Sequence, residues 1–393
     1  MKFKSNKAPI IYTQNNSVAL IRGGKKYFDL LLQLITNAKH SIHIQTYIFS
    51  NDETGKKVTN ALQIAVSRGV KVNLLVDGYA SQDLSNAFTT QLKKSGINFR
   101  FFEPIFRNNH FYFGRRLHHK VVVIDANSAL VGGLNIADHY NDLPGKPSWL
   151  DFALFVEGDV AQQLCVLCWK TWNGFALNTD TKKCEKVVKN FKIPLTNQVA
   201  VKMIRNDWVL RKNEISESYL NMFASSNKEI TILCSYFFPG TKIRRQMAKA
   251  VQRGVTIKVV VAGLSDVMIA KYAERWLYDW LLRKGIEIYE YQKNILHAKV
   301  AVCDDHWMTI GSYNINDISA YASIELNLEL TDANFCKEVR QTMEEIITNN
   351  CEKITSKKIK KATTIFKKIA HWSAYKCMRI VFYLFTFYFK QQN

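Results

Sequence analysis

Helical segments and apolar runs recur at matching places in the two halves of this chain. Residues 67–76 and 252–261 each contain an Arg-Gly pair followed by an apolar run, which predicts a helix capped by glycine and then a buried strand. Residues 92–97 and 281–286 repeat the order of helix, glycine and strand. The pattern therefore predicts one α/β unit used twice, with helices on both faces of a mostly parallel or mixed sheet.

An eight-residue pattern, His-x-Lys-x-x-x-x-Asp, occurs once in each half. The apolar runs inside the two copies, residues 121–124 and 300–303, predict buried strands. Residues two apart on a strand share a face, so the His and Lys of each copy point the same way. The Asp lies an odd number of positions from the His, and we expect it to orient neighbours or to end the strand. The residues are His118, Lys120 and Asp125 in the first copy and His297, Lys299 and Asp304 in the second.

A small pair and an asparagine follow each copy after the same gap. They are Gly132-Gly133-Leu134-Asn135 and Gly311-Ser312-Tyr313-Asn314. Glycine lets backbones approach closely, and the amides of Asn135 and Asn314 can donate to an oxyanion. A single His-x-Lys pair would fit an ordinary surface strand, but two copies with matching turns favour one shared site at the interface of the halves.

Two His, two Lys and two Asn around one phosphate-sized space predict a phosphodiester reaction centre. One His would attack phosphorus and become a phosphohistidine, while the other protonates the leaving alkoxide and then deprotonates the acceptor. The lysines and asparagines would bind the non-bridging oxygens where charge accumulates. This chemistry requires no metal and no other cofactor.

These motifs resemble the phospholipase D superfamily, in which two such motifs build one active site. The resemblance covers about residues 10 to 345 and implies two pseudo-symmetric α/β/α sandwich halves with mixed β-sheets. More narrowly, the chain resembles the bacterial cardiolipin synthases of the B type, which lack amino-terminal membrane spans. The closer match is carried by Leu75-Val76-Asp77-Gly78-Tyr79, Asp83-Leu84-Ser85, Ser235-Tyr236-Phe237-Phe238-Pro239-Gly240 and Asp305-His306-Trp307.

The resemblance also implies roles for single residues. Asp151 and Glu329 would be orienting carboxylates in a crossed arrangement, with Asp151 on His297 and Glu329 on His118, although either could be a solvated charge at a strand end. By family analogy His118 is the nucleophile. After the second Asn, residues 317–323 depart from the Arg-Ser that is frequent in the family, which puts substrate contacts in the second half in doubt.

The implied activity is phosphatidyl transfer between two phosphatidylglycerol molecules, which gives cardiolipin and glycerol. The motif alone also permits water as the acceptor, so a phospholipase D-type hydrolase or a nuclease of the same superfamily is the main alternative. A non-catalytic membrane or nucleic-acid scaffold is an alternative of another class, and two intact motifs argue against it.

The first half carries about ten extra residues before its motif. Gly96 and His118 are 22 positions apart, whereas Gly285 and His297 are 12 apart. Aromatic and arginine side chains suggest either a rim that meets lipid headgroups or a packed loop over the sheet. The residues are Phe106, Arg107, Asn108, Asn109, His110, Phe111, Tyr112, Phe113, Arg115 and Arg116.

The net charge of +21 over 393 residues predicts a polyanionic partner, either nucleic acid or an anionic membrane. Residues 352–390 hold ten Lys or Arg and one acid, so this tail carries +9. With the resemblance, the expected partners are an anionic phospholipid membrane and phosphatidylglycerol, and nucleic acid is disfavoured. The pattern leaves the oligomeric state open.

Residues 351–393 are expected to form a membrane-binding tail, apart from catalytic halves at 1–185 and 186–350. Apolar positions at helical spacing among lysines, followed by aromatics, suit a helix in the membrane interface; a disordered tail or a helix packed on the core are alternatives. The apolar positions are Phe366, Ile369, Ala370, Ser373, Cys377 and Ile380; the basic ones are Lys360, Lys361, Lys367, Lys368, Lys376 and Arg379; the aromatics are Phe382, Tyr383, Phe385, Phe387, Tyr388 and Phe389.

The expected location is the cytoplasmic face of a bacterial membrane, held peripherally. The first residues lack the apolar region of a secretory signal. The longest apolar run, residues 380–389, is half of the roughly 20 residues needed to span a bilayer. Cys165 and Cys168 have no second cysteine pair to complete a zinc site, and we expect buried thiols in a reducing compartment.

Overall fold

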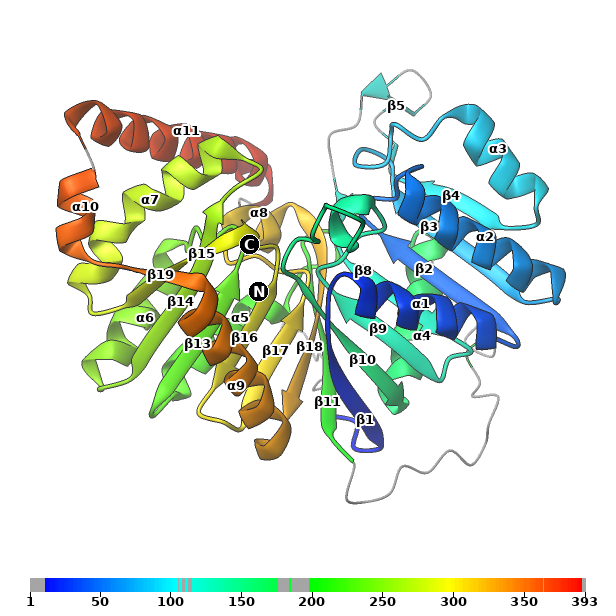
Figure 1. The fold of residues 1–393 in the computed structure, drawn as a ribbon, viewed down its shortest axis with the longest axis horizontal. Coiled ribbons are helices and arrows are strands. Elements are labelled where there is room, and N and C mark those ends of the chain that lie inside the picture. Colours follow the sequence, from blue (N-terminus) through cyan, green and yellow to red (C-terminus); the bar gives the residue numbers. More distant parts are fainter. Residues whose placement is uncertain are drawn as a thin grey trace, which may run out of the picture.

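Two β-sheets, one from each half of the chain, lie side by side in the computed structural model (Figure 1). The structure describes residues 11–104, 106–107, 110–111, 115–175, 184, 198–362 and 364–390. Helices cover both faces of each sheet, because core clusters form on both sides. This confirms the predicted α/β architecture with two similar halves.

The first sheet has seven strands in the order β1-β10-β9-β8-β2-β3-β4. Strands β2, β3 and β4 are parallel, as βαβ units require, and the remaining pairs are antiparallel. The elements of this half are β1 (Asn16–Arg22), α1 (Lys25–Asn37), β2 (Ser41–Thr46), α2 (Glu53–Ser67), β3 (Lys71–Asp77), α3 (Asn86–Lys94), β4 (Asn98–Phe102), β5 (Phe106–Arg107), β6 (His110–Phe111), β7 (Arg116–Leu117), β8 (Lys120–Ile124), β9 (Ser128–Gly132), the 3-10 turn Asp138–Tyr140, β10 (Phe152–Gly158) and α4 (Asp159–Trp172).

The second sheet repeats this plan in the order β12-β11-β18-β17-β16-β13-β14-β15-β19, with β7 of the first half added beside β18. Strands β13, β14 and β15 are parallel, like β2, β3 and β4. The elements are β11 (Ala200–Asp207), β12 (Lys212–Asn213), α5 (Glu214–Ser225), β13 (Glu229–Cys234), α6 (Thr241–Gln252), β14 (Thr256–Leu264), α7 (Met268–Arg283), β15 (Glu287–Ile295), β16 (Lys299–Cys303), β17 (Trp307–Gly311), α8 (Asp317–Tyr321), β18 (Ser323–Thr331), α9 (Ala333–Asn350), β19 (Cys351–Ile354), α10 (Ser356–Ala362) and α11 (Ile365–Lys390).

One apolar core joins the two halves. It contains the inner side of α4, the inner side of α9 and residues of both sheets, among them Phe152, Leu154, Leu328 and Leu330. The outer faces of the sheets have separate cores, under α1, α2 and α3 in the first half and under α5, α6 and α7 in the second. The shared core fixes the halves against each other, so residues at their junction hold defined positions.

The aspartates of the two motifs lie at the far ends of their strands. Asp125 accepts hydrogen bonds from the backbone N–H groups of residues 39–41, at the start of β2. Asp304 accepts in the same way from residues 227–229, at the start of β13. Both have positive φ, 51° and 49°, in the left-handed region that Asp tolerates better than most residues. They join neighbouring strands and end β8 and β16, which agrees with the expectation that they end the strand.

The tail begins within the second sheet. Residues 351–354 form β19, which pairs antiparallel with β15 and so belongs to the second half. Helix α11 then packs along α7 and buries Ala374, Tyr375 and Phe382 (Figure 1). Among the described helices, none is both long and apolar enough to cross a bilayer.

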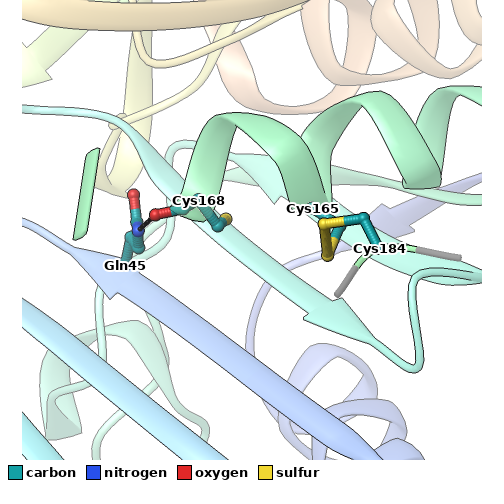
Figure 2. The surroundings of a disulfide bond; sticks show 4 residues. All are labelled: Gln45, Cys165, Cys168 and Cys184. Carbon is teal, nitrogen blue, oxygen red and sulfur yellow. Dashed lines mark hydrogen bonds between the residues drawn. A yellow bond between two sulfur atoms is a disulfide. The ribbon is translucent and has the colours of Figure 1, made fainter. Parts of the chain in front are cut away.

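Cys165 of α4 forms a disulfide with Cys184, which lies on the connection between the halves (Figure 2). The expectation of two buried thiols is wrong for Cys165, because this residue is disulfide-bonded. No sequence pattern marks the bond, since the partner lies 19 residues away and outside any local motif. Cys168 is a buried thiol as expected. Its backbone carbonyl accepts a hydrogen bond from Gln45 of β2 at 2.8 Å, which ties α4 to the sheet.

Most side chains of the extra segment in the first half lie outside the described residues. Its backbone forms a short hairpin, β5 with β6. Arg115 and Arg116 are described, and both turn into the protein: Arg115 is buried against Asp207, and Arg116 donates to the carbonyl of Glu103 at 2.7 Å. These two arginines therefore hold the halves and the loop together and do not line an outer rim.

We expect Asp304→Ala to destabilise the fold, because three backbone donors lose their acceptor. The loss should be about 1–2 kcal/mol in urea unfolding at neutral pH. Burial opposes ionisation of Asp304, but the backbone bonds outweigh it and hold the pKa below its usual range. A carboxyl group whose pKa is lower in the folded state stabilises the fold fully above its unfolded pKa of about 4, and this stabilisation is lost as the pH falls through the folded pKa. The difference in the free energy of unfolding between Asp304→Ala and the parent should therefore shrink below about pH 4.

Asp279→Ala is the matched control, since Asp279 is exposed and its carboxylate pairs with Arg283 one helical turn away. It should change stability by less than about 0.5 kcal/mol. An Asp304→Ala protein as stable as this control would contradict the assigned role.

Candidate active site

The two motif histidines lie where the halves meet, and the other half holds each of them. The backbone N–H of His118 donates to the carbonyl of Ile324 at 3.1 Å, and that of His297 donates to Leu150 at 2.8 Å. The residue that follows each of these acceptors, Glu325 after Ile324 and Asp151 after Leu150, carries a carboxylate. Asp151 lies 2.7 Å from Nδ1 of His297, and Glu325 lies 2.9 Å from Nδ1 of His118.

Both carboxylates are fully buried at the entry to corresponding strands, β10 and β18. The sheet register shows this correspondence. Ala153 pairs with Gly132 on β9, and Asn327 pairs with Gly311 on β17, so the residues two positions earlier are Asp151 and Glu325. The crossed arrangement is therefore present, with Asp151 on His297 as expected.

The expected role of Glu329 on His118 is wrong, because Glu325 holds that place. Glu329 lies four residues farther along β18, about 13 Å away on an extended strand. There it accepts from Tyr12 at 2.5 Å and lies 3.3 Å from Lys202. The sequence spacing is misleading because the first half has five more residues between its asparagine and its carboxylate. Asn135 and Asp151 are 16 positions apart, but Asn314 and Glu325 are 11 apart.

In each half, the residue that follows the turn glycine, Gly132 or Gly311, fits the carboxylate beside it. A Cβ on Gly133 would lie 2.4 Å from an oxygen of Asp151, so only glycine leaves room there. The corresponding Ser312 has a side chain, and its hydroxyl donates to Glu325. The difference between Gly-Gly and Gly-Ser in the two copies thus follows from how each half holds its carboxylate.

The motif lysines are buried beside the histidines. Lys120 donates to the carbonyl of His118 at 2.6 Å. Lys299 donates to the carbonyl of His297 and to the hydroxyl of Ser235, the latter at 3.0 Å. Strand geometry places the His and Lys of each motif on one side, as predicted.

The predicted asparagines hold loops around the site. The side-chain oxygen of Asn135 accepts from the backbone of Ile48 at 3.0 Å, and its amide donates to the Tyr140 hydroxyl at 2.8 Å. The oxygen of Asn314 accepts from the Ser235 hydroxyl at 2.8 Å, and Ser235 also accepts from Lys299. Asn135 therefore reaches the histidines through Tyr140, whose hydroxyl lies 3.4 Å from Nε2 of His297.

Aromatic side chains surround the histidines, and sequence analysis did not find them. The ring of Tyr47 lies 4.9 Å from that of His118 and 5.2 Å from the ammonium of Lys120. Tyr140 and Trp149 lie 5.2 and 5.9 Å from the ring of His297. Tyr47 follows β2, Tyr140 ends the 3-10 turn, and Trp149 lies just before β10, so no periodic pattern marks them. The side chain of His118 is 19% exposed and that of His297 is 8% exposed, so His118 is the more accessible imidazole.

The two imidazole–carboxylate pairs differ in charge. Burial raises the pKa of Asp151 to about 7, and burial together with Lys299 lowers the pKa of His297. Burial also acts on Glu325, but His118 and Lys120 outweigh it and hold the Glu325 pKa below its usual range. Near pH 7 the pair of His297 and Asp151 can therefore share one proton, whereas Glu325 in the other pair is ionised.

Burial lowers the pKa of Lys120 to about 7, with Glu325 opposing. Burial likewise lowers the pKa of Lys299, against the effect of Asp151. A bound anion would restore both charges, because it supplies the counter-charge that the buried lysines lack. The arrangement suits an anion flanked by two imidazoles and two lysines.

Histidine NMR would test which glutamate holds His118. Burial lowers the pKa of His118 and Glu325 raises it, so Glu325→Gln should lower that pKa further. Glu329→Gln is the same change four residues along the same strand and should leave the His118 titration as in the parent. An equal response to both substitutions would contradict the pairing.

Comparison with known proteins agrees with this geometry. The family model described as "Cardiolipin synthase, PLD-like domain" matches residues 31–143 and 219–347. The chain is 34% identical to cardiolipin synthase B of Salmonella typhimurium over an alignment of 358 residues. This alignment covers 90% of this chain and 85% of the relative. The chain is 32% identical, with the same coverage, to cardiolipin synthase B of Escherichia coli K12.

Among solved structures, the phosphatidylserine synthase of Haemophilus influenzae superposes with a TM-score of 0.69 at 15% identity, covering 88% of this chain and 89% of that one. At this identity the likeness concerns the fold alone, and it agrees with an α/β fold of two similar halves. The family match over both halves and the sequence identity over nine-tenths of the chain carry the assignment. This chain belongs to the cardiolipin synthase family of the phospholipase D superfamily.

Proposed function

We propose that this chain is a phosphatidyltransferase that makes cardiolipin and glycerol from two phosphatidylglycerol molecules. The observation that carries the proposal is the pair of crossed imidazole–carboxylate contacts, 2.7 and 2.9 Å long, beside two buried lysines. Two imidazoles that face one anion site provide a nucleophile and an acid–base group. The names of the similar proteins supply the substrate class.

In the first step His118 attacks the phosphorus of one phosphatidylglycerol through Nε2. Its Nδ1–H donates to ionised Glu325, which leaves Nε2 with its lone pair and stabilises the positive ring. A P–N bond forms and the P–O bond to the glycerol headgroup breaks. The proton held by His297 and Asp151 passes to the departing glycerol oxygen, while Lys120 and Lys299 stabilise the charge on the phosphoryl oxygens.

In the second step a hydroxyl of another phosphatidylglycerol gives its proton to His297 and attacks phosphorus. The P–N bond breaks, so His118 is released and cardiolipin is formed. Each step leaves the proton where the next one needs it. The more buried position of His297 suits this role, because exclusion of water favours an alcohol as the acceptor.

The direct test is incubation of the full-length protein with phosphatidylglycerol vesicles labelled in the headgroup and in the phosphate. We expect labelled cardiolipin and free labelled glycerol, separated by thin-layer chromatography, with His118→Asn as the inactive control. Phosphatidic acid without cardiolipin would indicate a hydrolase. Cleavage of DNA without lipid turnover would indicate a nuclease.

Substitution of the histidines tests the division of roles. His118→Asn and His297→Asn should each lower turnover by on the order of 10⁴-fold or more, and the double variant should fall no further, because the two act as a unit. Denaturing the parent protein at alkaline pH during turnover, conditions under which the P–N bond of a phosphohistidine survives, should trap labelled phosphate on the peptide that contains His118. A label on the His297 peptide would reverse the assignment.

A further inference from the structure

The outer face of helix α11 is apolar although the helix already packs on α7 through its other face. Ala374, Tyr375 and Phe382 are buried on the packed side. The apolar positions that the sequence singled out in this helix are all exposed; the largest of them are Phe366 at 81%, Ile369 at 57% and Ile380 at 60%. A helix with two apolar faces has one face left to cover.

A second group of exposed apolar side chains adjoins this helix. They lie between the end of β14 and the middle of α7. They are Leu264, Val267, Met268, Ile269, Tyr272 and Trp276, exposed between 37% and 56%. Tyr272 contacts His371 with ring centroids 5.4 Å apart, and Trp276 contacts Tyr375 at 6.3 Å. The start of α7 and α11 therefore form one continuous surface, which we call the α7–α11 face.

The α7–α11 face borders the active site. Asp266, between Leu264 and Met268, accepts a hydrogen bond from the Tyr236 hydroxyl at 2.7 Å. The charge of Asp266 also acts on the pKa of Tyr140, which touches His297. On the packed side of α11, the ring of Phe382 lies 5.3 Å from that of Phe238, which follows β13. The face thus reaches the loops that surround the two histidines.

The charge of the face is strongly positive. Residues 356–383 contain eight Lys or Arg and no acid. Lys368, Lys376 and Arg379 are exposed, and the ammonium of Lys376 lies 5.8 Å from the ring of Trp372, which is itself 47% exposed. Basic side chains among apolar and aromatic ones match the interface of an anionic bilayer, which offers both hydrocarbon and negative headgroups.

We propose that the α7–α11 face is the surface on which the protein docks to an anionic lipid bilayer, with the β14–α7 segment inserted beside the mouth of the active site. This deepens the proposed function, because it supplies the side from which a lipid would reach His118 and His297. The tail helix alone is not the anchor. The docking surface combines it with a segment of the second half that lies more than 90 residues earlier in the sequence.

Point substitutions test this surface without removing the tail, since truncation at residue 350 would also delete strand β19. Three exposed isoleucines allow one matched change: Ile269→Ser on α7, Ile369→Ser on α11, and the control Ile64→Ser on α2, with exposures of 44%, 57% and 50%. Helix α2 lies at the opposite end of the molecule from α11 (Figure 1). All three are made in the His118→Asn protein, so that the lipid stays unchanged during the measurement.

The assay is co-sedimentation with vesicles of phosphatidylglycerol and phosphatidylcholine, compared with phosphatidylcholine alone. Ile269→Ser and Ile369→Ser should each weaken binding to the anionic vesicles about fivefold, because each removes part of an apolar side chain that docking would bury. The Ile64→Ser protein should bind like its parent. Lys368→Gln with Lys376→Gln should reduce the preference for anionic over neutral vesicles. Thermal unfolding should be similar for all variants, since the residues are exposed.

Each other outcome overturns part or all of the proposal. If only Ile369→Ser weakens binding, the α7 segment is not part of the docking surface. If neither isoleucine matters, or if the protein binds duplex DNA and not vesicles, the face does not dock to lipid. Binding without turnover in the proteins that retain His118 would leave the docking surface standing and contradict the proposed reaction instead.

Discussion

Each motif histidine depends on a carboxylate from the other half of the chain. The backbone N–H and the imidazole of each histidine are held by two consecutive residues at the start of a strand across the junction. Neither half can orient its own histidine, so the site exists only when the shared core between the sheets has formed. Sheet register, the junction core and the placement of α4 and α9 all serve this single requirement.

The fold and the central chemistry could be predicted because the same sequence pattern occurs in both halves of the chain. Repeated strands, glycine caps and two copies of one motif predict two α/β halves with their histidines together, and the register of β8 and β16 agrees. Asp125 and Asp304 follow from the same reasoning. Their odd spacing from the histidines predicts a place away from the reacting groups, and both accept backbone hydrogen bonds at the far ends of their strands.

The remaining errors have a common physical cause, which is contact between residues distant in the sequence. Glu325 and Glu329 are four residues apart and share a face of β18, so neither strand alternation nor sequence spacing could tell which of them contacts His118. The bond between Cys165 and Cys184 and the packing of α11 on α7 carry no local signal. Tyr47 and Tyr140 were missed because loops lack periodicity, although both touch a histidine or its lysine.

The pairing of β19 with β15 changes what kind of attachment the tail provides. A flexible tail would leave the two catalytic halves free to rotate relative to any surface that the tail touches. Here four residues of ladder join the tail to the same sheet that carries Lys299, and α11 lies flat against α7. The motif histidines therefore keep one distance and one orientation relative to α11. Any surface that binds α11 would be held at a constant angle to the junction of the two halves.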